Sequence, residues 1–161
     1  MLFRSLYCGL MMTARGPMVL EFNCRFGDPE TQPILLRLES DLVDALEASI
    51  AGRVSAGDFK WSRDASVCVV MASGGYPGTY DVGKKIAGLD EAGAIEGVKV
   101  FHAGTSRRDG AFYTAGGRVL GVSARAPELE TAVQRAYQAC EKIGFDGAHC
   151  RKDIAARALK K

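Results

Sequence analysis

Polar and apolar side chains alternate from Val19 to Phe26, and a period of two residues is the pattern of an extended strand. One side of that strand is made of Val19, Glu21, Asn23 and Arg25. The opposite side is apolar and can rest on a hydrophobic core. The alternation therefore predicts a β-strand that presents a carboxylate, an amide and a guanidinium in a row.

The polar residues of this strand offer two kinds of chemistry. Glu21 and Asn23 both supply oxygen, the ligand type that a hard cation such as Mg²⁺ prefers. Arg25 supplies a planar fork of donors that suits phosphate or carboxylate. The same spacing is also typical of the solvent-facing side of any antiparallel sheet, so spacing alone leaves both interpretations open.

The residues that follow the strand favour the binding interpretation. Gly27-Asp28-Pro29-Glu30 is a turn sequence, and loops at strand ends often carry functional residues. Asp28 and Glu30 add negative charge close to Glu21. Such crowding is unfavourable unless a cation or an arginine compensates for it.

The run from Glu21 to Gln32 closely resembles the metal-binding signature near the end of the ATP-grasp region in glycinamide ribonucleotide synthetases, a family also called phosphoribosylamine–glycine ligases. Four further matches follow in the family's order, so the resemblance covers nearly all of the chain. These matches are Ala72–Gly78, Val100–Thr105, Gly116–Leu120 and Arg151–Ile154.

The resemblance implies an α+β fold. The expected architecture is the terminal fragment of an ATP-grasp antiparallel sheet with helices, followed by a small, mainly antiparallel β domain packed with one long helix. The boundaries that we expect are 1–53 for the ATP-grasp piece, 54–64 for a connector and 65–161 for the C-terminal domain.

The resemblance also implies an activity, in which ATP drives the joining of glycine to 5-phosphoribosylamine through glycyl phosphate, a step of purine synthesis. Glu21 and Asn23 match the family's Mg²⁺ (or Mn²⁺) ligands. Arg25 would stabilise the phosphoryl group as a catalytic residue. A substrate-side loop would contain Gly27, Asp28 and Pro29, with Asp28 positioned for an amino group.

The family's proteins are much longer than 161 residues, and the resemblance covers their carboxy-terminal part. We therefore expect the amino-terminal ATP-grasp lobes to act in cis or in trans, and the isolated chain to be inactive. Two alternatives stay open. The chain could be a non-catalytic fragment that complements a separate amino-terminal half, or it could come from another ATP-grasp carboxylate–amine ligase.

Composition argues against several other classes of protein. The net charge of +2 gives no argument for nucleic acid, and no apolar run approaches the roughly twenty residues that span a bilayer. The five cysteines are odd in number and form no C-x-x-C, which argues against a disulfide framework or a zinc site. A reducing cytoplasm is the simplest compartment.

Periodicity and turn residues predict the remaining elements. Expected strands cover 2–12, 18–25, 65–72, 98–103, 111–114 and 118–125, with a turn at 107–110, and 148–154 is expected to be a final strand or an extended segment. Expected helices begin near Thr31 and Asp41 and cover 127–143, with short helical segments at 89–95 and 155–161.

The other motifs are weaker. The glycines of 73–78 favour a tight loop over a phosphate-binding loop, because the motif lacks the Lys-Ser/Thr of a P-loop. His102 favours a hydrogen-bonded structural role, and His149 stays open. Arg118 and the cluster Arg151-Lys152-Asp153 are candidates for contact with an anionic substrate, with solvated surface charge as the default.

Overall fold

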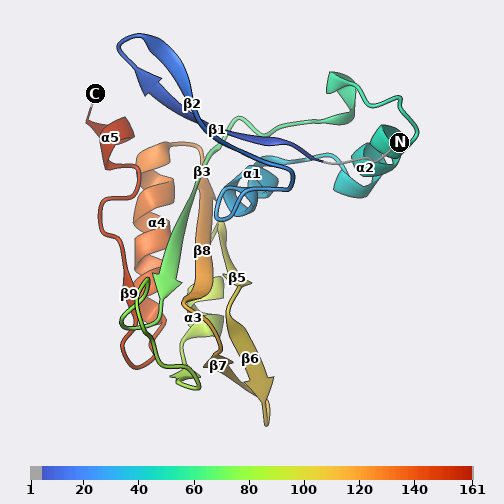
Figure 1. Cartoon of the computed structure of the whole chain (residues 1–161). Coiled ribbons are helices and arrows are strands. Elements are labelled where there is room, and N and C mark those ends of the chain that lie inside the picture. The colour runs from blue at the N-terminus through green and yellow to red at the C-terminus, as the bar shows by residue number, and fades with distance from the viewer. Residues whose placement is uncertain (1–4, 161) are drawn as a thin grey trace. The chain divides into compact units, whose positions relative to one another are not determined.

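The computed structural model describes residues 5–160 (Figure 1). Their contacts divide the chain into two compact units. The first unit comprises the described residues up to Thr31 together with Leu38–Ser62. The second comprises Gln32–Arg37 and the described residues from Arg63 onward.

The first unit begins with an antiparallel hairpin of β1 (Tyr7–Thr13) and β2 (Gly16–Asn23), which confirms the expected hairpin. The Thr13 side chain closes the turn, because its hydroxyl donates to the Gly16 carbonyl (2.9 Å) and accepts from the Arg15 amide (3.1 Å). Residues 2–4 of the expected first strand lie outside the described residues.

The second strand ends earlier than the alternation predicts. The ladder stops at the pair Tyr7–Asn23, so Cys24 and Arg25 lie in the bend beyond β2. Placing Arg25 on the strand face with Glu21 was therefore wrong. The ladder ends here because Ser5 and Leu6, the described residues that precede β1, are not in a strand.

The rest of the first unit is built around α2 (Leu42–Ile50), whose N-cap Asp41 accepts a hydrogen bond from the Val43 amide at 2.7 Å. A short 3₁₀ turn, η1 (Ala56–Asp58), follows. The segments on either side of these helices are joined by the Leu38–Trp61 bridge and by the Glu39 amide, which donates to the Lys60 carbonyl (2.8 Å).

The second unit contains two antiparallel sheets. The larger has the order β5-β8-β3-β9, and its strands are β3 (Ala65–Ala72), β5 (Val98–His102), β8 (Arg118–Ala126) and β9 (His149–Cys150). The smaller has the order β4-β7-β6, and its strands are β4 (Lys85–Ile86), β6 (Thr105–Arg108) and β7 (Ala111–Thr114).

Helices cover both faces of the larger sheet. α4 (Leu129–Lys142) and α3 (Leu89–Gly93) pack on the face that carries Val69 and Val122. Both valines belong to the hydrophobic core between this face and the helices. α1 (Thr31–Arg37) lies on the opposite face. Two of its backbone carbonyl groups, both from residues of the second unit, accept hydrogen bonds from side chains of the strands. Ser66 donates to the Pro33 carbonyl at 2.6 Å, and Arg125 donates to the Leu36 carbonyl at 3.0 Å.

This architecture confirms the α+β class, the buried strand at 65–72 and the long helix near the end. The long helix begins at Leu129 rather than at Pro127, because its N-cap Glu128 has an extended backbone. The turn at Asp109-Gly110 also forms as expected, with both residues at positive φ. The domain boundary at 54–64 stays a prediction.

Of the segment 148–154, expected to be a final strand or an extended segment, only His149–Cys150 pairs with β3. Beyond it the chain bends around the Tyr137 side chain. The Tyr137 hydroxyl donates to the Arg151 carbonyl (2.9 Å) and accepts from the Ile154 amide (3.1 Å). A side chain thus satisfies backbone groups that a longer ladder would have used. α5 (Ala156–Leu159) ends the described chain.

None of the helices in the described part of the chain combines the length and the apolar character that a bilayer crossing requires.

Candidate functional site

The hairpin of the first unit contains a β-bulge at Leu20. Gly9 pairs with Glu21 and Leu10 pairs with Val19, so Leu20 has no directly opposed partner. Because consecutive residues of β1 point to opposite faces, Val19 and Glu21 lie on opposite faces as well. The prediction that Val19 shares a face with Glu21 was therefore wrong, since strict alternation cannot reveal an inserted residue.

The bulge leaves Glu21 and Asn23 together on one face. Their partners Gly9 and Tyr7 are two residues apart on β1, so all four positions share that face. Gly9 is buried and leaves room for the Glu21 side chain, because an added Cβ would lie 3.1 Å from the Glu21 Cγ. The structure thus places the two predicted metal ligands side by side.

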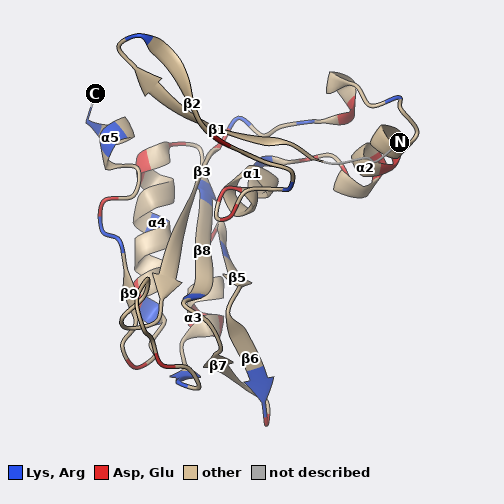
Figure 2. Ribbon diagram, viewed as in Figure 1, with Lys and Arg blue, Asp and Glu red and all other residues tan. Residues whose placement is uncertain are grey.

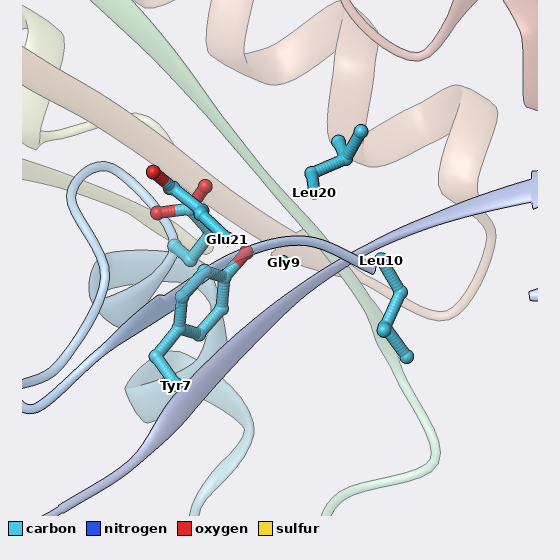
Figure 3. A pocket seen from close by; sticks show the side chains of 6 residues that line it. Tyr7, Gly9, Leu10, Leu20 and Glu21 are labelled. Atoms are coloured by element: carbon cyan, nitrogen blue, oxygen red, sulfur yellow. The ribbon is translucent and has the colours of Figure 1, made fainter. Parts of the chain in front are cut away.

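A cavity of about 460 Å³ opens at this face (Figure 3). It is lined by Tyr7, Gly9, Leu10, Leu20, Glu21 and Glu30. The Tyr7 hydroxyl donates a hydrogen bond to the Glu30 carboxylate. Burial, the charge and hydrogen bond of Glu30, and the charge of Glu21 together raise the pKa of Tyr7.

Tyr7 is the residue of this cavity that sequence reasoning missed. Counting the paired residues of β1 and β2 from the turn would place Tyr7 opposite Asn23 only if the bulge between the two strands were known. Glu30 was noted for its charge alone, whereas the structure shows that it is held by Tyr7. The carboxylates of Glu21 and Glu30 therefore meet at one cavity.

The donor set of this face fits a weakly held Mg²⁺ better than a closed metal site. Glu21 and Asn23 supply one carboxylate and one amide, and Mg²⁺ commonly keeps waters and completes its shell with substrate phosphates. In the part of the chain that the structure describes, no three His, Cys, Asp or Glu side chains are grouped to hold a metal. A chelating site formed by this chain alone is therefore not indicated.

The predicted catalytic and substrate-side residues lie in the loop between β2 and α1, which carries acidic residues drawn in red in Figure 2. Arg25 is exposed, and its Nη1 donates to the Phe26 carbonyl at 2.8 Å. Gly27 is buried, and its carbonyl accepts hydrogen bonds from the amide and the hydroxyl of Thr31. The carbonyl of Gly27 thus anchors the start of α1.

Gly27 also has a steric role in this loop. An added Cβ at Gly27 would lie 2.5 Å from a carboxylate oxygen of Glu30. The neighbouring Asp28 is exposed, and the peptide bond between Asp28 and Pro29 is cis. Asp28 already takes part in an interaction within the chain.

A second cluster lies in the second unit, where three of the stretches that carry the resemblance meet. The Ser73 amide donates to the Gly117 carbonyl (2.8 Å), and the Ser73 hydroxyl donates to the Gly116 carbonyl (2.9 Å). The Arg118 Nε donates to the Tyr76 hydroxyl at 3.0 Å. An added Cβ at Gly104 would lie 2.7 Å from the Arg118 carbonyl oxygen. These contacts favour a packing role for Gly104, Gly116 and Gly117.

The two histidines and the cluster Arg151-Lys152-Asp153 show no arrangement for catalysis in the described structure. His102 Nδ1 lies 3.0 Å from the Thr105 hydroxyl, and its ring centroid is 4.3 Å from that of Phe112. His149 is exposed. Arg151 and Asp153 form an exposed ion pair at 2.7 Å, and this hydrogen-bonded partner lowers the pKa of Asp153.

The edge strand β6 is basic, as the blue colouring in Figure 2 shows. Arg107 and Arg108 each lie over an aromatic ring of the adjacent β7, at 5.5 Å from the Phe112 centroid and 4.7 Å from the Tyr113 centroid. Both guanidinium groups thus stabilise their own sheet.

Comparison with known proteins relates nearly the whole chain to one family. Residues 66–157 match the family model described as "Phosphoribosylglycinamide synthetase, C domain", and residues 3–31 match "Phosphoribosylglycinamide synthetase, ATP-grasp (A) domain". The phosphoribosylamine–glycine ligase of Rhodopirellula baltica is 50% identical over 155 residues, and that of Pseudomonas aeruginosa is 52% identical over the same length. The match covers 96% of this chain, whereas the chain spans 36% of the length of each relative.

Solved structures lead to the same grouping. The crystal structure of phosphoribosylamine–glycine ligase from Thermotoga maritima is 34% identical with a TM-score of 0.76, covering 92% of this chain and 36% of that one. N5-carboxyaminoimidazole ribonucleotide synthetase from the same organism has a TM-score of 0.63 at 16% identity, covering 89% of this chain and 37% of that one, and so shares the fold alone. The chain belongs to the phosphoribosylglycinamide synthetase family, of which it carries the C domain and a part of the ATP-grasp domain.

Proposed function

We propose that this chain forms part of an ATP-dependent ligase that joins glycine to 5-phosphoribosylamine, with glycinamide ribonucleotide, ADP and phosphate as products. The observation that carries the proposal is the identity of about half of all residues with relatives of that name, over 96% of the chain. The matched length includes the hairpin face with Glu21 and Asn23.

In this proposal, Glu21 and Asn23 hold Mg²⁺ or Mn²⁺ against the phosphates of ATP. The carboxylate and the amide share one face of the hairpin, and Gly9 leaves room there for the Glu21 side chain. When bound, the ion offsets the negative charge that develops on the transferring phosphoryl group. Tyr7 holds Glu30 beside Glu21 and so limits how this second carboxylate can move.

The residues of the following loop act on glycine. Arg25 provides positive charge for the phosphoryl group and the acyl phosphate, because its guanidinium is exposed at the end of β2. Asp28 is also exposed and suits the ammonium group of glycine. Gly27 and Pro29 give the loop its shape, since Gly27 is buried and anchored by Thr31.

The reaction has two steps. A carboxylate oxygen of glycine attacks the γ-phosphorus, the bond to ADP breaks, and glycyl phosphate forms. The amine nitrogen of phosphoribosylamine then attacks the glycyl carbonyl carbon, phosphate leaves, and the nitrogen loses a proton. Orientation of both substrates and charge stabilisation are the tasks that fall to the protein.

The isolated 161-residue chain is proposed to lack this activity. It spans 36% of the length of its relatives, and the apolar residues of the hairpin are exposed within the described structure. The simplest source of a cover for them is the remainder of the ATP-grasp region, in cis or in trans. ATP turnover by the isolated chain would contradict this part of the proposal.

The direct test replaces the matching portion of the Pseudomonas aeruginosa relative with these 161 residues. The chimera should form ADP only when glycine and 5-phosphoribosylamine are both present. Glu21→Gln in the chimera should lower kcat by about a hundredfold, because a metal ligand loses its charge. A folded chimera that is inactive, or that is unaffected by Glu21→Gln, would overturn the proposal.

The same chimera separates the remaining alternatives. Turnover with a carboxylic acid other than glycine, or with a different amine, would identify another ATP-grasp ligase. If the chain complements a separate amino-terminal half, co-expression of the two pieces should restore activity without a covalent link. A covalent chimera that is active while the two pieces are inactive would exclude that arrangement.

A further inference from the structure

Two cysteines from different elements share one pocket in the second unit. Cys140 lies in the last turn of α4 and is buried among the residues that face the larger sheet. Cys150 lies in β9, directly opposite Met71 of β3. Opposed residues of a ladder point to the same face, and Met71 belongs to the core beneath α4, so the Cys150 side chain also points toward α4.

The pocket confirms this arrangement independently. Its volume is about 340 Å³, and Met71, Cys140 and Cys150 all line it. A hydrogen bond joins the thiols of Cys140 and Cys150. The five cysteines, all in the part of the chain that the structure describes, form no disulfide in it.

The two thiols differ in access. Cys140 is 6% exposed, whereas Cys150 is half-buried and reaches solvent. Burial, together with the charge and hydrogen bond of Cys150, raises the pKa of Cys140 to about 12. The titratable groups around Cys140 are Cys150, Cys68, Lys152, Glu141 and His149, and of these Lys152 lowers the pKa. Cys150 is therefore the thiol that a solvent oxidant meets first.

We propose that Cys140 and Cys150 form a reversible oxidation site at which a hydroperoxide converts the two thiols into a disulfide. The Cys150 thiolate attacks a peroxide oxygen, the O–O bond breaks, and Cys150 becomes a sulfenic acid while hydroxide leaves. The Cys140 sulfur then attacks the sulfenic sulfur, water leaves, and the disulfide forms. Two thiols and one hydrogen peroxide thus yield one disulfide and two waters, and an external dithiol reverses the reaction.

The disulfide would tie β9 to the end of α4, next to the loop that carries Tyr76. β9 pairs with Met71 and Ala72, which directly precede that loop. Gly74 of the loop packs on the segment before β9, since an added Cβ there would lie 3.1 Å from the Gly147 carbonyl oxygen. Oxidation should therefore slow hydrogen exchange at the β3–β9 pairs and in this loop.

The test exposes the 161-residue chain to hydrogen peroxide, blocks remaining thiols with N-ethylmaleimide and maps peptides by mass spectrometry. The expected product is a cross-linked peptide containing Cys140 and Cys150, lost after reduction with a dithiol. Cys8→Ser, a change at an exposed cysteine of the first unit, should leave the cross-link unchanged. If Cys150 is over-oxidised while Cys140 keeps a free thiol, the proposal is wrong.

Two further measurements address the roles of the two sulfurs. In a Cys140→Ser variant, Cys150 should accumulate as a sulfenic acid that dimedone traps. In the unmodified chain, closure of the disulfide should accelerate about tenfold per pH unit between pH 6 and 9, because the Cys140 thiolate fraction rises tenfold per unit below its pKa. A closure rate independent of pH would contradict the assignment of Cys140 as the second thiol, and this result needs no variant to fold.

Discussion

The hairpin of the first unit and the larger sheet of the second unit are both rich in apolar residues, yet their burial differs. In the hairpin, Met12 is 74% exposed and Leu20 is 64% exposed. In the sheet, Val69, Leu120 and Val122 are fully buried. The second unit encloses its own core between strands and α4, whereas the described part of the first unit supplies no such cover for the hairpin's apolar residues.

This difference shows that an apolar strand can be recognised from the sequence, whereas the residues that cover it cannot. They can lie in the same unit or elsewhere. A two-stranded hairpin is marginal in water without a packing partner. The same hairpin carries Glu21 and Asn23, so the region with the strongest functional expectation is also the one that depends most on other structure. The second unit, in contrast, contains a buried core of its own.

The largest expected effect tests this division of stability. Leu120→Ala should lower the free energy of unfolding of the 161-residue chain by about 2–5 kcal/mol, because Leu120 is fully buried. Leu20→Ala, the same change on the exposed hairpin, should alter it by less than about 0.5 kcal/mol. Urea denaturation followed by circular dichroism measures both. Equal effects would show that the hairpin shares the core of the second unit.

Thiol reactivity offers the second test of the comparison. Cys8 and Cys24 of the first unit are exposed, whereas Cys140 is buried with its pKa raised to about 12. At pH 8 the thiolate fraction of Cys140 should be about a thousandfold below that of an unperturbed thiol, and its alkylation correspondingly slow. Iodoacetamide labelling with mass spectrometry gives each rate. Labelling of Cys140 as fast as Cys8 would mean that the core beneath α4 opens readily.

A smaller effect asks whether the self-supporting unit also contributes to function. Arg118→Ala in the chimera should raise KM for 5-phosphoribosylamine about tenfold, as expected for a lost hydrogen bond to a charged group, while the free energy of unfolding changes little. Tyr76→Phe removes the hydroxyl that Arg118 contacts at 3.0 Å and serves as the matched control. An unchanged KM in Arg118→Ala would restrict the functional residues to the first unit.

The smallest effect concerns the exposed Arg151–Asp153 pair. Its hydrogen bond lowers the pKa of Asp153, so any stabilisation is present above the carboxyl's unfolded pKa and is lost as pH falls through the folded one. Asp153→Asn should therefore shift the urea midpoint slightly at pH 7 and not at all at acidic pH, since exposed pairs contribute little. A shift that persists in acid would assign Asp153 another role.

Much of the local structure was predictable because its causes are local. The turn before Gly16, the N-cap Asp41 and the turn at Asp109-Gly110 all depend on neighbouring residues. The apolar run Ala65–Ala72 became a buried strand as predicted. In the segment 148–154 the strand is limited to His149–Cys150, because a distant side chain, that of Tyr137, takes the backbone hydrogen bonds of Arg151 and Ile154.

The candidate site was predictable in its residue types and not in its geometry. Alternation and the family resemblance identified Glu21 and Asn23, but the bulge at Leu20 reversed the face of Val19 and the end of the ladder removed Arg25 from the strand. The contact between Tyr7 and Glu30 was not foreseen, since it joins residues from opposite ends of the hairpin and its loop.

By itself, the sequence determined the family, most of the strands and helices, and the candidate oxygen ligands of the hairpin, because motifs and short-range periodicity depend on neighbouring residues. Only the tertiary structure decided which residues share a face, a pocket or a core. It placed Glu21 opposite Gly9, and it brought Cys140 and Cys150 into one pocket. The physical reason is that strand register and helix packing depend on contacts between distant residues, and no local pattern encodes them.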